Sequence, residues 1–257
     1  MINLTDRNLN INLEDYVFGV AAAEMPALFH DEALKAQAIA ARSYVLSKKK
    51  NNEIKITSTI NDQVYLTNEE LKAKWGKDYN KFYKKIKACV NETKNLVIKR
   101  EDKILKAFYF SMSNGYTENS KNVFKDVQIE SKPSKWDNPE IKNFIFEKTI
   151  TEDEIKTILN IKESINIQNI TRNETGRVST IEINNNIYSG LDIRQFLSLR
   201  STDFTIIKED NKYIITTKGY GHGVGMSQYG ANGMAKEGYT YNEILNYYYN
   251  NIKITKI

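Results

Sequence analysis

The chain has 257 residues, of which 40% are hydrophobic and 11% aromatic. This composition is typical of a folded protein with one large or two smaller domains, and it excludes a disordered chain. No apolar run approaches the roughly 18 residues that cross a bilayer. The single cysteine, Cys89, excludes an internal disulfide and is expected to be a buried structural thiol. The net charge of +5 suits an acidic polymer as partner, although scattered lysines also serve solubility.

Two helices are predicted near the N-terminus. Residues 12–24 carry apolar side chains at helical spacing, with Asn12 as the N-cap and Pro26 as the stop. A second helix is predicted from Asp31 to about Lys48, with Asp31 as its N-cap. Three capping boxes predict the starts of further helices: Thr67 with Glu70, Thr151 with Glu154, and Thr240 with Glu243.

Strands are expected in the middle and last thirds of the chain. Alternating or apolar runs predict strands at 95–100 and 104–112, joined by a turn at 101–103, and further strands near 178–183 and 186–189. Residues 203–219 alternate well and break at the letters EDN, which predicts a hairpin. Helices mixed with mostly antiparallel strands define the α+β class.

The stretch 125–150 holds two of the three prolines and few periodic signals, which is typical of a linker or an exposed excursion. We therefore predict a core in two parts, 1–124 and 201–257. A linker and an inserted subdomain are expected over 125–200.

The most unusual stretch is GYGHGVGMSQYG, with a glycine at every second position from Gly219 to Gly225. The spacing fits neither a dinucleotide fingerprint nor a phosphate-binding loop. Strict alternation predicts an extended strand with one bare face, which another backbone or a flat ligand such as a sugar ring approaches closely. Tyr220, His222 and Val224 would project from the other face. The alternative is a tightly packed corner in which His222 holds one hydrogen bond.

Glu24 closes the first predicted helix in the sequence AAAEMP. Apolar surroundings raise the pKa of a carboxyl group, which is the environment of a general acid. A glutamate also meets the unfavourable end of the helix dipole there, so stability does not explain it. Lys35 and Arg42 lie two turns apart on the next helix and share a face. We expect them either to form a cationic stripe beside Glu24 or to be two solvated charges.

A third polar cluster, FSMSNGYTENS, begins where a predicted strand ends. Loops at strand ends often carry binding sites. The alternative is a plain glycine turn. The candidate residues in this loop are Ser113, Asn114, Gly115 and Thr117.

The motifs EMP, EALKAQAIAARSY, SNGYTEN, LRSTDFTI and GYGHGVGMSQYGANGMA resemble, in this order, those of the stage II sporulation protein D family and the related amidase enhancers. The resemblance runs from Glu14 to the end of the chain, and the last motif is the most specific. It implies a lytic transglycosylase that cuts MurNAc-GlcNAc bonds of peptidoglycan during engulfment of the forespore, with a preference for denuded strands. It also implies that Glu24 is the single catalytic residue and that the products end in 1,6-anhydro-MurNAc.

The resemblance also implies substrate contacts and partners. Lys35, Arg42, His222, Ser227 and Gln228 match family positions, and with the loop residues named above and Tyr220 and Gly223 they form the expected substrate-binding set. The implied partners are glycan strands, an amidase/endopeptidase and a membrane scaffold of the engulfment machinery. The implied location is extracytoplasmic, at the mother-cell membrane facing the intermembrane space, with the N-terminal anchor absent from this chain.

One departure from the family pattern concerns zinc. Some members carry histidine and cysteine just before a QVY or QAY motif and bind zinc there. The corresponding sequence here is KITSTINDQVY, with neither residue between Lys50 and Tyr65. We therefore predict no zinc at this place and no cofactor.

Two other functions stay open at this stage. One is a non-catalytic module that binds glycan and activates a cell-wall amidase. The other is a true hydrolase, which needs a second carboxylate such as Glu32 or Glu118 within reach. Nucleic-acid binding is the least favoured reading, and we expect no nucleic-acid partner.

Overall fold

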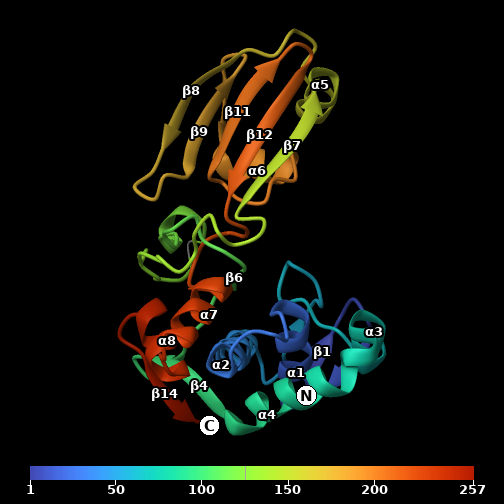
Figure 1. Ribbon diagram of the computed structural model, residues 1–257, viewed down its shortest axis with the longest axis vertical. Helices are drawn as coiled ribbons and strands as arrows, with labels where there is room; N and C mark the ends of the chain where they lie inside the picture. Colours follow the sequence, from blue (N-terminus) through green and yellow to red (C-terminus); the bar gives the residue numbers. More distant parts are fainter. Residues whose placement is uncertain (125) are drawn as a thin grey trace. The chain divides into compact units, whose positions relative to one another are not determined.

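The computed structural model describes residues 1–124 and 126–257, which form two compact units (Figure 1). Unit 1 consists of Met1–Ser111 and Gln228–Ile257, and unit 2 is Met112–Ser227. Helices and mostly antiparallel sheets confirm the α+β class. In the part of the chain that the structure describes, no helix combines the length and the hydropathy needed to cross a membrane.

The first helices of unit 1 begin and end close to the predicted residues. Helix α1 (Leu13–Glu24) has Asn12 as its N-cap, whose side chain accepts from the Asp15 N–H. Helix α2 (Asp31–Ser47) is also confirmed, but the prediction that Asp31 caps it was wrong. The N-cap is His30, whose Nδ1 accepts from the Glu32 N–H at 3.3 Å. Asp31 is instead the first helical residue, where its charge suits the helix dipole.

Helix α2 forms the centre of unit 1. It is alanine-rich and almost wholly buried, and small side chains allow close approach of neighbouring elements. It packs against α1, α4 (Tyr79–Glu92), α7 (Gln228–Lys236), α8 (Tyr241–Tyr248) and β4 (Leu96–Arg100). Helix α3 (Asn68–Trp75) and the short 3-10 helix η1 (Gly76–Asp78) precede α4.

Two small sheets complete unit 1. One has the order β2 (Leu9–Ile11), β1 (Ile2–Leu4), β3 (Lys55–Ile56), and the other has the order β14 (Lys253–Lys256), β4, β5 (Lys103–Ile104). The predicted strand at 95–100 and its turn are confirmed. The prediction of one strand over 104–112 was wrong, because β5 and β6 (Tyr109–Phe110) are separate. Ala107 and Phe108 are both buried, which breaks the alternation that a continuous strand requires.

Unit 2 contains two three-stranded antiparallel sheets (Figure 1). The first has the order β11 (Phe204–Glu209), β12 (Lys212–Lys218), β7 (Ile145–Thr151), and β11–β12 is the predicted hairpin. The second has the order β10 (Asn186–Ser189), β9 (Val178–Ile183), β8 (Ile167–Arg172). Apolar residues of both sheets share one core with helices α5 (Glu152–Leu159) and α6 (Gly190–Phe196).

All three predicted capping boxes are present, at the starts of α3, α5 and α8. A fourth, formed by Ser189 and Asp192, begins α6 and was not predicted. The stretch 125–150, expected to be a linker, ends in β7, and residue 125 itself lies outside the described residues. Most β7 side chains are partly or fully exposed, so the strand lacks a clear apolar alternation. The short helix η2 (Ser120–Asn122) and strand β13 (Met226–Ser227) also belong to unit 2.

The prediction that the glycine run is an extended strand was wrong. Gly219, Gly221, Gly223 and Gly225 have φ values of 76, 119, 86 and 81°, which glycine alone adopts at low cost. A Cβ at Gly219 would lie 2.8 Å from the Met112 carbonyl oxygen. The close approach expected from the bare face therefore exists, and within unit 2 a backbone makes it.

We expect Gly19→Ala to destabilise unit 1. A Cβ there would lie 2.2 Å from the Tyr65 ring and 2.8 Å from the Leu66 carbonyl oxygen. Overpacking of this kind costs about 1–3 kcal/mol, more than alanine gains in helix propensity where backbone must also move. Gly76→Ala is the comparison: there is space for a Cβ at this residue, so any loss of stability there comes from the φ of 51° and not from overpacking. Urea unfolding that shows Gly19→Ala as stable as the parent would contradict this packing.

Candidate active site

Glu24 is the last residue of α1, where the chain leaves the helix at Met25 in an extended conformation. Its Oε1 accepts a hydrogen bond from the Val64 N–H at 2.9 Å. The amide side chain of Gln228, the first residue of α7, is also a hydrogen-bond partner of the carboxylate. Both partners belong to unit 1, so one unit builds the whole setting of this carboxyl group.

Burial raises the pKa of the Glu24 carboxyl above its ordinary value of 4.5. The Val64 N–H, the charge of Lys74 and the Gln228 side chain oppose this rise without cancelling it. No other carboxylate of the described chain contributes to the shift. The group is thus a protonated acid over a wider pH range than an exposed glutamate, as the apolar sequence around it predicted.

Lys74, from α3, lies at the same end of α1. Its Nζ donates to the carbonyl oxygens of Ala23 at 3.0 Å and Ala22 at 3.3 Å. These are carbonyls of the last helical turn, where a cation is favourable. Desolvation lowers the pKa of Lys74, while the charge of Glu24 acts in the opposite direction. The sequence reading missed this lysine, because nothing local links residue 74 to residue 24.

The phenol of Tyr109, which is partly buried, lies near the carboxylate. Gln63 accepts from the Tyr16 hydroxyl at 2.9 Å and donates to the Tyr109 hydroxyl oxygen at 2.8 Å. Desolvation raises the pKa of Tyr109, and the charge of Glu24 adds to the rise. Tyr109 therefore stays protonated and can serve as a hydrogen-bond donor in this part of unit 1.

Gln37 extends the polar setting into α2. Its Oε1 accepts from Gln228 Nε2 at 3.4 Å. Its own Nε2 is buried without a hydrogen-bond partner among the described residues. A buried, unsatisfied donor is uncommon in folded proteins, and such groups gather at functional sites. Gln37 is therefore another residue of this site that the sequence did not single out.

The structure does not place Lys35 and Arg42 in a stripe beside Glu24. Lys35 forms ion pairs with Glu92 at 2.7 Å and Glu32 at 2.9 Å, and the hydrogen bonds of these pairs raise its pKa. Arg42 is fully buried. Its guanidinium donates to both carboxylate oxygens of Glu14 at 2.7 and 2.9 Å and to the Leu96 carbonyl oxygen at 3.0 Å. Through these contacts Arg42 connects α2 to the start of α1 and to β4.

Two of the predicted substrate-binding serines are buried in unit 2. Ser113 and Ser227 both donate to the Asp137 carboxylate, at 2.7 and 2.9 Å, and Ser134 adds a third hydroxyl at 2.7 Å. Burial raises the pKa of Asp137 despite these three donors. The two serines therefore join the polar loop to the end of the glycine run within this unit.

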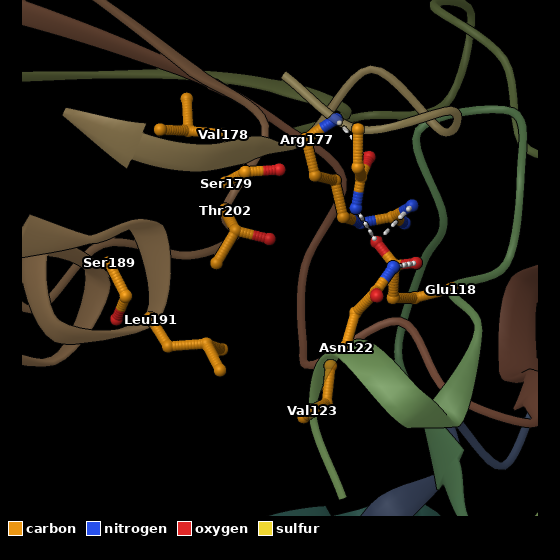
Figure 2. Close-up of a pocket in the computed structure, with 10 residues that line it drawn as sticks. Glu118, Asn122, Val123, Arg177, Val178, Ser179, Ser189, Leu191 and Thr202 are labelled. Atoms are coloured by element: carbon orange, nitrogen blue, oxygen red, sulfur yellow. Dashed lines mark hydrogen bonds and ion pairs between the residues drawn. The ribbon is translucent and has the colours of Figure 1, made fainter. Parts of the chain in front are cut away.

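A cavity of about 160 Å³ lies in unit 2 beside a buried ion pair of Glu118 and Arg177 (Figure 2). Its polar lining comes mostly from hydroxyl and amide side chains, and its apolar members are Val123, Val178 and Leu191. Ligand pockets usually measure roughly 300–1,000 Å³. This cavity is therefore large enough for a few water molecules or one small group and is too small for a glycan strand.

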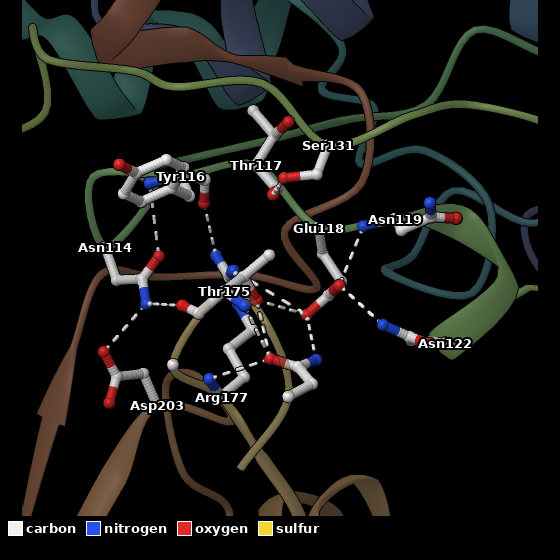
Figure 3. Close-up of polar contacts among 12 residues, drawn as sticks. Asn114, Tyr116, Thr117, Glu118, Asn119, Asn122, Ser131, Thr175, Arg177 and Asp203 are labelled. Carbon is white, nitrogen blue, oxygen red and sulfur yellow. Dashed lines mark hydrogen bonds and ion pairs between the residues drawn. The ribbon is translucent and has the colours of Figure 1, made fainter.

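The Glu118 carboxylate is fully engaged (Figure 3). Oε2 accepts from Asn173 Nδ2 and Thr175 Oγ1, both at 2.8 Å, and Oε1 accepts from the Asn119 N–H at 2.8 Å and Asn122 Nδ2 at 2.9 Å. Arg177 Nη1 lies 3.7 Å from Oε2. A carboxylate with so many partners is a structural anchor.

The Arg177 guanidinium joins three segments of unit 2. It donates to the Tyr116 carbonyl oxygen at 2.9 Å, and a Cβ at Gly223 would lie 3.0 Å from its Nη2. A side chain at residue 223 would thus meet both the guanidinium and the Glu118 Cβ, and the φ of 86° also favours glycine there. The predicted role of Gly223 as a sugar platform has no open surface behind it, since the residue is buried.

The remaining loop residues have mostly structural partners. Asn114 donates to Asp203 at 2.8 Å and to the Thr175 carbonyl oxygen at 2.9 Å, as Figure 3 shows. Thr117 is buried, and its hydroxyl accepts from the Lys132 N–H at 2.8 Å. Gly115 turns the chain with a φ of 107°. The plain-turn alternative therefore describes much of this loop.

His222 and Tyr220 keep accessible surface. Nδ1 of His222 accepts from the Val224 N–H at 3.1 Å, and its ring packs edge-on against Phe124 at 5.2 Å. In the neutral imidazole the proton is then on Nε2. Tyr220 is 49% exposed, with the Arg200 guanidinium 5.4 Å from its ring centre. These two side chains are the members of the predicted set in unit 2 best able to reach a ligand.

No group of three or more His, Cys, Asp or Glu side chains suited to a metal ion occurs within residues 1–124 and 126–257. At the place discussed for zinc, Asp62 instead pairs with Lys48 at 2.8 Å. Cys89 is buried in α4, as expected, and desolvation raises the pKa of its thiol to about 11.

The fold and the site thus define the class as an α+β protein with a partly buried glutamate of raised pKa at a helix end. Comparison with known proteins gives the family. A family model described as Stage II sporulation protein matches residues 5–99, and one described as Domain of unknown function (DUF8618) matches residues 69–225. The chain belongs to the stage II sporulation protein D family.

The curated relatives agree with this assignment. The chain is 41% identical to the stage II sporulation protein D of Bacillus subtilis (strain 168), over 96% of this chain and 75% of that protein. It is 39% identical to the Bacillus amyloliquefaciens protein of the same name over the same shares. It is 30% identical to the amidase enhancer of Bacillus subtilis (strain 168), over 92% of this chain and 40% of that protein.

We expect Glu24→Gln to stabilise the protein at neutral pH. Because folding raises the pKa of Glu24, the stability associated with its protonated form is present below pH 4.5 and is lost as pH rises through the folded-state pKa. A neutral glutamine avoids this loss. The melting temperature of the Glu24→Gln protein should exceed that of the parent by a few degrees at pH 7 and should equal it below pH 4.5. An equal difference at both pH values would contradict the burial of a charge.

We expect Arg42→Met to destabilise the fold through Glu14. Removing one partner of a buried pair costs about 3 kcal/mol, because the other charge is left uncompensated. Combining Arg42→Met with Glu14→Gln should restore part of the lost free energy of unfolding, as measured by urea unfolding. Additive effects of the two substitutions would show that the ion pair does not couple them.

Proposed function

We propose that this chain is a lytic transglycosylase that cleaves the bond between N-acetylmuramic acid and N-acetylglucosamine in peptidoglycan strands. The observation that carries the proposal is the place of Glu24, a partly buried carboxyl group at the end of α1 that accepts from the Val64 N–H at 2.9 Å. Burial raises its pKa, and no second carboxylate contributes to its setting. Hydrolysis of a glycosidic bond ordinarily needs two carboxylates. An intramolecular reaction needs only one group that acts first as acid and then as base.

The reaction balances with Glu24 alone. The protonated carboxyl donates its proton to the glycosidic oxygen, and the bond from this oxygen to C1 of the muramic residue breaks. The resulting carboxylate takes the proton of the muramic C6 hydroxyl, whose oxygen forms a new bond to C1. The products are a 1,6-anhydromuramic end and a free hydroxyl on the departing glucosamine, and no water is consumed. Glu24 ends protonated and ready for another turnover.

The local contacts suit these two roles. The Val64 N–H and the Gln228 side chain hold the carboxylate in one orientation. Lys74 adds a positive charge that favours the ionised form needed for the second step. Burial and Lys74 thus act in opposite directions on the pKa, which keeps both protonation states accessible.

The true-hydrolase alternative has less support. Glu118 is buried and already accepts four hydrogen bonds. Glu32 is paired with Lys35 and accepts from the Tyr241 N–H at 2.7 Å. Neither of the carboxylates considered for water activation is therefore available in this structure.

The relative named amidase enhancer keeps the second candidate function open, a glycan-binding module that activates a cell-wall amidase. We further propose that the protein works outside the cytoplasm on denuded strands during engulfment, beside an amidase/endopeptidase and a membrane scaffold. Among the residues predicted to contact sugars, His222 and Tyr220 in unit 2 have the accessible surface that this role requires.

We expect the parent protein to release fragments lighter by one water than hydrolytic products from peptide-free glycan strands. Glu24→Gln should lower the rate by about 100- to 10,000-fold, as loss of a general acid and base does. Glu69→Gln, which removes an exposed carboxylate of α3, is the matched control and should keep the parent rate. Mass spectrometry of the products provides the measurement.

Two outcomes would contradict the proposal. Hydrated products would indicate a hydrolase. Binding of strands without cleavage by the parent protein, together with full stimulation of an amidase by Glu24→Gln, would indicate the activator.

A further inference from the structure

The segment 71–87 of unit 1 is strongly basic and rich in aromatic residues. It contains seven lysines and one acidic residue, Asp78, together with Trp75, Tyr79, Phe82 and Tyr83. The fold places this segment on α3, η1 and α4. Buried Leu71 and Ile86 face the interior, which leaves the aromatic rings at the rim and most of the lysines outside.

The four rings form one partly exposed cluster. The ring centre of Trp75 lies 5.7 Å from that of Phe82 and 6.1 Å from that of Tyr79, and Tyr79 lies 5.5 Å from Tyr83. All four are partly accessible to solvent. Partly exposed aromatic surface of this extent suits a ligand with an apolar face.

Unpaired lysines surround the cluster. Lys72 Nζ lies 5.6 Å from the Tyr79 ring centre, and Lys81 Nζ lies 5.9 Å from that of Phe82. Both are exposed, as is Lys84, and in the described part of the chain no carboxylate forms an ion pair with any of the three. We call Trp75, Tyr79, Phe82, Lys72, Lys81 and Lys84 the aromatic–lysine surface.

This surface begins next to the end of α1 that carries Glu24. Helices α1 and α4 run antiparallel, as shown by the ion pair of Asp15 with Lys87 at 2.9 Å and the ring contact of Phe18 with Tyr83 at 4.8 Å. Extending this pairing by one helical turn places Tyr79, at the start of α4, beside the last turn of α1. Lys74, next to Trp75, bonds the carbonyl oxygens of that turn.

We propose that the aromatic–lysine surface binds the peptidoglycan strand on one side of the bond that is cleaved, and this inference rests on the proposed function. A polymeric substrate must extend beyond the reacting bond. The apolar faces of its sugar rings suit the aromatic side chains. Each muramic residue without a stem peptide carries a free carboxylate, which suits the unpaired lysines. Helix α4 has 14 residues and is about 21 Å long, enough to lie along several sugar rings.

The test measures binding apart from cleavage, in the Glu24→Gln background. Two probes are compared: peptide-free peptidoglycan strands, which carry carboxylates, and a neutral N-acetylglucosamine oligomer. Replacing Lys72, Lys81 and Lys84 together by glutamine should weaken binding of the anionic strands at least about tenfold and leave the neutral oligomer nearly unchanged. The effect should diminish with added salt.

The matched control replaces Lys49, Lys50 and Lys103, exposed lysines elsewhere in unit 1, by glutamine. It removes the same charge and should bind both probes as the background does. Trp75→Ala should weaken binding of both probes several-fold, and Trp75→Phe should restore it. Melting temperatures identify any variant that has simply unfolded.

If the two triple variants lose the same affinity for the anionic strands, the proposal is overturned, because net charge alone would then explain binding. Vesicles of anionic phospholipid serve as a third probe. If replacing Lys72, Lys81 and Lys84 abolishes binding to these vesicles but leaves strand binding intact, the proposal is overturned and the surface is assigned to a membrane. If the parent protein does not cleave strands but the triple variants still differ as expected, the proposed catalysis fails while the binding surface stands.

Discussion

The setting of Glu24 depends on one constraint, the partial burial of a carboxyl group at the C-terminal end of a helix. Both burial and the helix dipole disfavour the charged form there. The fold compensates in part with the Val64 N–H, the Gln228 side chain and the Lys74 ammonium group, which come from three separate segments. Gly19 of α1 packs closely against Tyr65 and Leu66. This contact keeps the segment that contains Val64 next to α1.

The polar residues of unit 2 have a different physical task. Asp137 with its three serines and Glu118 with Arg177 are buried charged groups, and each is surrounded by hydrogen-bond donors or acceptors from distant parts of the unit. They fix the polar loop against the glycine run, whose unusual backbone conformation needs glycine. A motif that resembles a binding loop in sequence is here in large part a means of packing two backbones closely. His222 and Tyr220 are left at its accessible side.

Much of the fold could be predicted from local signals. The capping boxes, the end of α1 and the hairpin of β11 and β12 depend on residues close in sequence, and all are confirmed. Glu24 could be singled out because its apolar neighbours are adjacent to it. Lys74, Tyr109 and Gln37 could not, since they approach Glu24 and Gln228 only through tertiary packing. The buried positions of Arg42, Ser113 and Ser227 could not be predicted either, because their carboxylate partners lie between 24 and 90 residues away in the sequence.

The central claim is that burial keeps the Glu24 carboxyl protonated above the pH at which an exposed glutamate ionises. The most direct measurement is a carbon-13 NMR titration of the glutamate side-chain carboxyl groups, with the Glu24 signal assigned by its loss in Glu24→Gln. The account predicts a midpoint above 4.5, and a still higher midpoint in Lys74→Met, which removes the opposing positive charge. A midpoint at or below 4.5 would contradict it, because Glu24 would then ionise at the same pH as an exposed glutamate, or lower.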